Sequence, residues 1–203
     1  MRRCLILLLF LWCASAAAAS PSPRTVLVLG DSLSAAHNIP VEAGWVHLLE
    51  ARTSDMEPAW AVVNASISGE TSLSGRNRLP ALLEKYKPGV VVIELGANDG
   101  LRGLPLAKLG ENLDAMIAAS VKAGSKVLLL GIELPINYGP QYRDGLRAVY
   151  RDAAAKHRVA LLPFLLDGVA TDPSLMQDDG LHPTAKGEPR VAENVWPALK
   201  PLL

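Results

Sequence analysis

The sequence predicts an α/β protein, a three-layer α/β/α sandwich around a five-stranded, mainly parallel sheet. Short apolar runs alternate with longer amphipathic stretches along the chain, which is the pattern of strands joined by crossover helices. The run VVVIEL at 90–95 is almost continuously apolar, as expected of a strand that helices cover on both faces. The periodicity leaves the order of the strands in the sheet open.

The first expected strand, 25–29, is apolar or β-branched throughout, and Gly30 after it permits a tight turn through backbone angles that other residues avoid. A helix is expected at 44–52, because Trp45, Leu48 and Leu49 fall on one face. The other expected strands are 61–64, 90–95, 126–132 and 159–164. The other expected helices are 79–86, ended with the help of Pro88, 104–123, with Gly124 at its exit, 141–157 and 184–199.

Residues 1–19 have the layout of a secretory signal peptide. Arg2 and Arg3 precede an apolar centre at 5–12, and small residues follow it up to Ala19. The apolar centre is shorter than the roughly 20 residues that a membrane-spanning helix needs. We therefore expect cleavage, a periplasmic or secreted mature protein without a stable membrane anchor, and a single domain over residues 20–203.

The composition of the mature chain excludes several classes of function. Half of the 203 residues are apolar and a fifth are charged, which is typical of a globular domain. Removing residues 1–19 leaves 18 basic and 20 acidic residues, a formal charge of −2 that offers no basic footprint for nucleic acid. Both cysteines, Cys4 and Cys13, lie in the leader, so the mature chain has no disulfide, thiolate metal site or cysteine nucleophile.

Four polar clusters follow expected strands. They are Gly30-Asp31-Ser32, the stretch NASISGET at 64–71, Gly96-Ala97-Asn98-Asp99-Gly100, and DDGLHP at 178–183. Because the carboxyl ends of parallel strands share one edge of a sheet, we expect these clusters to converge. Together they hold a hydroxyl, an imidazole, carboxylates, an amide and glycine-rich turns, the groups that acyl transfer to a serine requires.

These blocks resemble those of the SGNH (GDSL) hydrolase family, in particular its bacterial periplasmic thioesterase/lysophospholipase branch. The resemblance covers essentially the whole mature chain and is carried by GDSL at 30–33, VVNASISGETS at 62–72, ELGANDGLRG at 94–103, LPINYGPQY at 134–142 and MQDDGLHP at 176–183. It implies a flavodoxin-like fold and a serine esterase that needs no metal and no cofactor. A monomer is expected.

Carried over residue by residue, the resemblance implies that Ser32 is the nucleophile and His182 the general base. Asp179 would orient His182, with Asp178 as the rival for this role. The oxyanion hole would consist of the backbone N–H groups of Ser32 and Gly69 and the side-chain amide of Asn98.

The expected substrates are short- to medium-chain acyl esters and thioesters, with lysophospholipids as a further class. The residues expected to border an apolar substrate site are Leu101, Leu134, Pro135, Ile136 and Tyr138. Two alternatives stay open at this point. The first is a carbohydrate O-acetyl esterase of the same family, and the second is a non-catalytic periplasmic binding protein on this scaffold.

Overall fold

The computed structural model describes residues 24–203, so the expected signal peptide lies outside the described residues. Over this part of the chain, five parallel strands form one sheet in the order β2-β1-β3-β4-β5. The strands are β1 (Thr25–Gly30), β2 (Ala61–Asn64), β3 (Val90–Glu94), β4 (Lys126–Leu130) and β5 (Ala160–Leu162). The expected parallel sheet is confirmed, and the structure adds the strand order.

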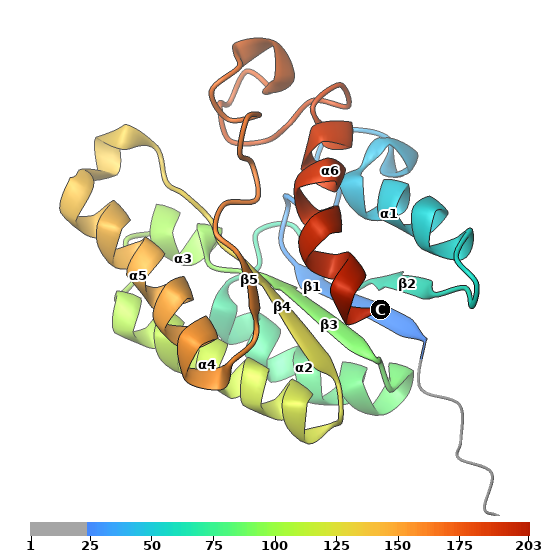
Figure 1. Ribbon diagram of the computed structural model, residues 1–203. Coiled ribbons are helices and arrows are strands. Elements are labelled where there is room, and N and C mark those ends of the chain that lie inside the picture. Colours follow the sequence, from blue (N-terminus) through green and yellow to red (C-terminus); the bar gives the residue numbers. More distant parts are fainter. Residues whose placement is uncertain (1–23) are drawn as a thin grey trace, which may run out of the picture.

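Helices cover both faces of the sheet, which confirms the three-layer sandwich (Figure 1). On one face α1 (Trp45–Ser54) packs against α6 (Glu188–Leu199), and on the other α4 (Leu106–Lys122) lies between α2 (Ser72–Tyr86) and α5 (Pro140–His157). The short α3 (Ala97–Leu101) follows β3, and single 3-10 turns occupy Val41–Ala43, Ile136–Tyr138, Pro173–Leu175 and Lys200–Leu202. Between residues 24 and 203, no helix combines the length and apolarity that crossing a membrane requires.

The core is thickest around β3, the central strand. All five of its residues are buried, whereas the residues of the edge strands β2 and β5 are exposed or half-buried. Trp45 at the start of α1 is also buried, and its indole Nε1 donates a hydrogen bond to the carbonyl of Leu33 at 3.0 Å. The core therefore reaches up to the loop after β1 and fixes it against α1.

Three helices differ from the sequence-based expectation. Helix α2 begins at Ser72, seven residues earlier than expected, because the side chain of Thr71 caps it by accepting from the N–H of Ser74. Helix α3 was expected to be a glycine-rich turn. Helix α6 begins at Glu188 rather than at 184, and Thr184 belongs to the preceding loop, where its N–H donates to the carbonyl of Leu175 at 2.8 Å.

Candidate active site

Ser32 lies in a turn directly after β1, at the carboxyl edge of the sheet. The carboxylate of Asp31 accepts the N–H of Leu33 at 3.0 Å, which closes the turn around the serine. Gly30 does not adopt the left-handed conformation, so the expected reason for this glycine is wrong. It is needed for space, because a Cβ there would lie 2.7 Å from the hydroxyl of Ser34 and 2.8 Å from a carboxylate oxygen of Glu94.

The hydroxyl of Ser32 meets the imidazole of His182, and the imidazole meets Asp179. The distance from Ser32 Oγ to His182 Nε2 is 2.8 Å, and His182 Nδ1 lies 2.7 Å from Asp179 Oδ2. The other oxygen of Asp179 accepts the N–H groups of Leu181 at 2.8 Å and His182 at 3.0 Å. Asp178 is exposed and is not among the groups bonded to this histidine. The three predicted catalytic side chains thus form one hydrogen-bonded line.

Asp179 is held in its ionised form. Burial opposes ionisation, but the hydrogen bonds from the backbone N–H of Leu181 and from His182 outweigh it and lower the pKa of Asp179 to about 2. A carboxylate facing Nδ1 favours the tautomer that carries its proton there. Nε2 is then left as an acceptor for the hydroxyl of Ser32.

The loop that carries His182 is tied to the loop that carries Ser32. The backbone N–H of Gln177 donates to the carbonyl of His182 at 2.8 Å. Its side-chain amide donates both to the carbonyl of Pro183 at 2.8 Å and to that of His37 at 2.9 Å. The ring of His37 also packs against that of His182, with centroids 4.4 Å apart and planes tilted by 41°. The loop that carries Ser32 thus also packs against the imidazole through His37.

The expected oxyanion donors are linked to one another through Asn98, which contacts a neighbour of Ser32 and a neighbour of Gly69. Asn98 in α3 directs its Nδ2 to a carboxylate oxygen of Asp31 at 3.0 Å and to the carbonyl of Glu70 at 3.1 Å. Gly69 adopts a φ of +80°, which favours glycine, and its carbonyl accepts from Arg102 at 3.0 Å. Among the described residues, no acceptor is bonded to the backbone N–H of Ser32 or of Gly69. Both donors are therefore free to bind an incoming oxygen.

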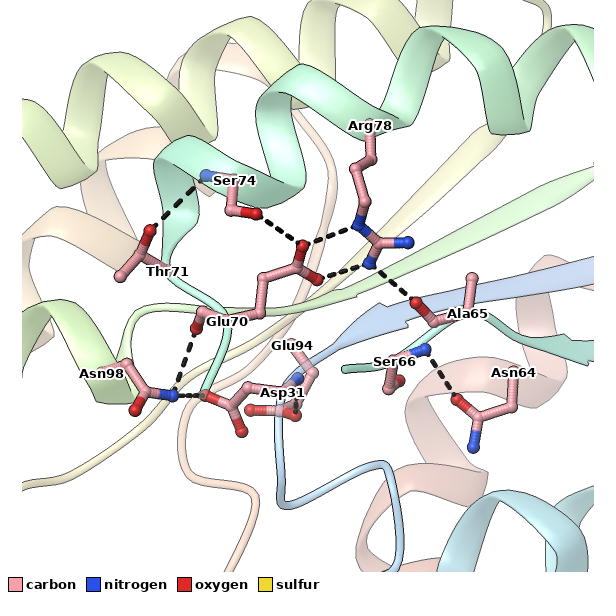
Figure 2. A network of polar contacts seen from close by, with 10 residues as sticks. All are labelled: Asp31, Asn64, Ala65, Ser66, Glu70, Thr71, Ser74, Arg78, Glu94 and Asn98. Atoms are coloured by element: carbon pink, nitrogen blue, oxygen red, sulfur yellow. Dashed lines mark hydrogen bonds and ion pairs between the residues drawn. The ribbon is translucent and has the colours of Figure 1, made fainter. Parts of the chain in front are cut away.

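A polar network holds the loop of Gly69 in place (Figure 2). The carboxylate of Glu70 is buried, and Arg78 of α2 forms an ion pair with it while donating to the carbonyl of Ala65 at 2.8 Å. Asp99 accepts both the N–H of Ser72 at 2.8 Å and its hydroxyl at 2.6 Å. The stretch between β2 and α2 is thus anchored at both of its ends, by Arg78 near β2 and by Asp99 at the start of α2.

An apolar cavity of about 210 Å³ opens beside Ser32 and His182. Its lining comprises Ser32, Leu33, Ala97, Asn98, Leu101, Ile132, Glu133, Leu134, Pro135, Phe164, Leu166, Leu181 and His182. Of the residues expected to bind substrate, Leu101, Leu134 and Pro135 belong to this wall. Phe164 and Leu166, which follow β5, were not among the substrate residues predicted from the sequence. Their signal was the apolar stretch at 164–166, which continues past the strand without an amphipathic pattern.

The other two expected substrate residues lie elsewhere. Ile136 is 83% exposed and lines a neighbouring cavity of about 330 Å³, which shares six wall residues with the first. Tyr138 lines neither cavity. Its hydroxyl donates to the carbonyl of Leu101 at 2.9 Å, so it supports the wall from behind.

Glu133 is the one acidic residue among the described residues that line the two cavities, and arginines from α5 neutralise it. Arg147 Nε lies 2.7 Å from its carboxylate and Arg143 lies 3.1 Å from it. The hydrogen bond from Arg147 and the positive charge of both arginines lower the pKa of Glu133. Arg143 also donates to the carbonyl of Leu134 at 2.8 Å, so this arginine braces the wall as well.

A serine, a histidine and an aspartate joined in this way on a parallel sheet are shared by serine hydrolases of α/β architecture, and this is the class that fold and site define. Comparison with known sequences then gives the family. The chain belongs to the GDSL-like lipase/acylhydrolase family, whose sequence model matches residues 28–189. The resemblance noted from the sequence blocks is therefore confirmed.

Named relatives and solved structures agree with this assignment. The chain is 53% identical over 180 residues to Esterase TesA of Pseudomonas aeruginosa, covering 89% of this chain and 90% of the relative. It is 41% identical over 179 residues to thioesterase 1/protease 1/lysophospholipase L1 of Escherichia coli K12, covering 88% and 85%. The crystal structure of TesA superposes with a TM-score of 0.87, covering 89% of this chain and 100% of that one at 53% identity. AlinE4, an SGNH-hydrolase family esterase, gives a TM-score of 0.73, covering 91% and 99% at 30% identity.

Proposed function

We propose that this ester hydrolase cleaves acyl esters and acyl thioesters through an acyl-enzyme on Ser32. The observation that carries the proposal is the hydrogen-bonded line from Ser32 through His182 to Asp179, whose Ser32 end lies in the wall of an apolar cavity. A serine hydroxyl is a weak nucleophile at neutral pH, so a histidine must take its proton as it attacks. Asp179 stabilises the imidazolium that forms.

Attack on the acyl carbon forms the Oγ–C bond and places a negative charge on the former carbonyl oxygen. The N–H groups of Ser32 and Gly69 and the amide of Asn98 stabilise this oxyanion. Asp31 holds one hydrogen of the Asn98 amide, so the second one, now near the carbonyl of Glu70, is shared with the oxyanion. When the tetrahedral intermediate collapses, His182 returns its proton to the leaving oxygen or sulfur. A water molecule then repeats the sequence and releases the acid.

The cavity supports an acyl chain as the recognised part of the substrate. Seven of its wall residues are apolar side chains of Leu, Ile, Pro or Phe beyond the serine turn: Leu101, Ile132, Leu134, Pro135, Phe164, Leu166 and Leu181. Each methylene buried there contributes about 0.8 kcal/mol. The first cavity suits short to medium chains, and the second cavity beyond the shared wall gives longer chains room to continue.

The two alternatives fit this site less well. A carbohydrate O-acetyl esterase needs polar groups for the sugar, whereas this cavity is lined mainly by hydrocarbon. A non-catalytic binding protein has no need for an aligned serine, histidine and aspartate. We further infer from residues 1–19 that the enzyme is exported to the periplasm or secreted. That it works as a monomer is a separate proposal.

The test is a rate series with p-nitrophenyl esters of increasing chain length, one acyl-CoA, one lysophospholipid and one acetylated sugar. We expect kcat/KM to rise with acyl length to a medium-chain optimum, by up to about 4-fold per methylene, and expect the acyl-CoA to be hydrolysed. Faster turnover of the acetylated sugar than of every acyl ester would contradict the proposal. So would the absence of turnover with all of these substrates.

A further inference from the structure

Two carboxyl groups meet beneath the nucleophile turn in a place that water does not reach. Asp31 follows β1 and Glu94 ends β3, the neighbouring strand, where it pairs in register with Gly30. Both residues are 0% exposed. Figure 2 shows their carboxyl groups side by side, with the amide of Asn98 next to Asp31. In the described part of the chain, no arginine or lysine is bonded to either of them.

Two carboxylates in contact cannot both be ionised in such a site. Burial disfavours each charge, and the second charge adds repulsion, so a pair of this kind retains one proton between its members. The hydrogen bonds that each carboxyl oxygen makes decide which of the two residues keeps that proton.

Asp31 is bonded as an anion. One of its oxygens accepts the N–H of Leu33 at 3.0 Å, and the other accepts the amide of Asn98 at 3.0 Å. Burial is the main influence on the pKa of Asp31 and raises it to about 6, against the opposing effect of these bonds and of His182. With two donors directed at it, Asp31 is the better site for the negative charge.

Glu94 is bonded as an acid. Its Oε2 accepts the N–H of Asp31 at 3.2 Å and the hydroxyl of Ser34 at 2.7 Å. Its Oε1 is buried and has no partner among the described residues, although the two side chains are close enough to share a hydrogen bond. A proton on Oε1 directed at Asp31 satisfies this oxygen. Burial, followed by the charge of Asp31, raises the pKa of Glu94 well above its ordinary value.

We propose that Glu94 is a positioning residue that keeps a proton on Oε1 and donates it to the carboxylate of Asp31, which in turn orients the amide of Asn98. This rests on the proposed function, in which Asn98 is an oxyanion donor. An amide can turn by 180° with little change of shape, so something must select the orientation. The carbonyl of Glu70 and an anionic Asp31 both accept from the NH₂ group. The charged carboxylate selects the orientation more strongly than the neutral carbonyl, because it attracts the NH₂ group and repels the amide oxygen.

The other ionisable groups around the pair do not supply this proton. Tyr150 of α5 donates its hydroxyl proton to the carbonyl of Leu95 at 2.9 Å. The carboxylate of Asp99 in α3 accepts hydrogen bonds from the N–H and the hydroxyl of Ser72. His182 faces Asp31 from the opposite loop, and when it becomes positively charged it favours the anionic form of Asp31.

The test compares two substitutions of Glu94 that have nearly the same shape. In Glu94→Gln the amide oxygen still accepts from Asp31 and Ser34, and the NH₂ group replaces the O–H donor. We expect kcat within about 3-fold of the wild type. Glu94→Met has no donor that could stabilise the anionic form of Asp31, so the amide of Asn98 loses its selected orientation. We then expect kcat to fall by up to about 10² with little change in KM. Equal losses in both variants would overturn the proposal.

Infrared difference spectra test the protonation state without relying on activity. The spectrum of wild type minus Glu94→Gln near pH 7 should show the carbonyl stretch of a protonated carboxyl group. The control Glu111→Gln, an exposed residue paired with Lys108, should show carboxylate bands instead. Carboxylate bands for Glu94 would overturn the proposal even if Glu94→Met failed to fold. Labelling of wild-type Ser32 by a fluorophosphonate separates the two claims, because a failure of the proposed function would abolish it and an ionised Glu94 would not.

Discussion

Ser32 and His182 are 150 positions apart in the chain, and yet Oγ of the serine lies 2.8 Å from Nε2 of the histidine. Ser32 follows β1, which lies inside the sheet between β2 and β3. His182 comes from the long loop after β5, which is an edge strand of the sheet. The side chain of Gln177 bridges the two loops by donating to the carbonyls of His37 and Pro183. The contact between nucleophile and base therefore depends on how these loops are joined as well as on the sheet.

The two adjacent aspartates at 178 and 179 should behave differently. Asp179→Asn should reduce kcat by up to about 10⁴, because the amide no longer stabilises the imidazolium and favours the wrong tautomer. The matched control Asp178→Asn, which replaces an exposed carboxylate, should leave kcat unchanged. Because the pKa of Asp179 is about 2, its titration should not contribute to the pH profile of the wild type above pH 4. Steady-state kinetics of both variants check this, and a larger loss in Asp178→Asn would reverse the assignment.

Asn98→Ala should slow turnover by about 10²–10³ with a much smaller effect on KM, because an oxyanion donor acts mainly in the transition state. The control is Asn77→Ala, an exposed position on α2, which should match the wild type. Purified variants are compared at saturating ester concentration. A loss below 3-fold in Asn98→Ala would show that the amide is no part of the oxyanion hole.

Filling the second cavity, the one of about 330 Å³, should change the preference of the enzyme for acyl-chain length. Ala170 lies in its wall, so Ala170→Trp should fill the space into which longer acyl chains extend. Each methylene displaced should cost about 0.8 kcal/mol, which is about 4-fold in kcat/KM, while acetyl and butyryl esters should be unaffected. Ala118→Trp on the exposed side of α4 is the control. An unchanged ratio of long- to short-chain rates would mean that the chain does not enter this cavity.

The buried carboxyl group of Glu188 should make the free energy of unfolding depend on pH. It is buried at the start of α6 and accepts the N–H of Trp45 at 2.8 Å. Burial raises its pKa from 4.5 to about 7, although this hydrogen bond opposes the shift. The folded state therefore binds the proton more tightly than the unfolded state, and the resulting stability is complete below pH 4.5 and lost as pH rises through 7.

Glu188→Gln should remove this part of the pH dependence, which amounts to about 3 kcal/mol of unfolding free energy between pH 4.5 and 8. Urea denaturation at the two pH values measures it. The exposed Glu193 on the same helix is the control, since its pKa is lowered by Arg52 and Glu193→Gln should leave the dependence as it is. An unchanged dependence in Glu188→Gln would contradict the account of this residue.

Much of the fold could be predicted from the sequence, because the spacing of apolar residues indicates which segments are strands and which are helices. The run at 90–95 indicated the buried central strand within one residue of its end. The strand order was not predictable, since it depends on which edges pair and not on the pattern within a strand. The start of α2 was hidden because Ser72, Gly75 and Asn77 are weak helix formers, although Thr71 supplied a capping signal.

The polar groups of the site were easier to predict than its shape. Polar clusters after strands indicated where Ser32 and Asn98 would lie, and their expected roles stay predictions until they are measured. The cavity wall was harder, because it joins loops whose contacts no local pattern encodes, as the positions of Phe164 and Tyr138 show. Glu94 was overlooked inside an apolar run. A lone carboxylate in such a run was the available signal, since burying it requires a partner.

We expect substrate to acylate Ser32, and a fluorophosphonate reports on this serine without depending on the choice of substrate. Mass spectrometry of the labelled, digested protein should place the adduct on Ser32 alone, and Ser32→Ala should take up no label while losing about 10⁶ in kcat/KM. The control Ser54→Ala, at the exposed end of α1, should react and turn over like the wild type. An adduct on another serine, or a Ser32→Ala enzyme that keeps more than about a tenth of its activity, would contradict the account.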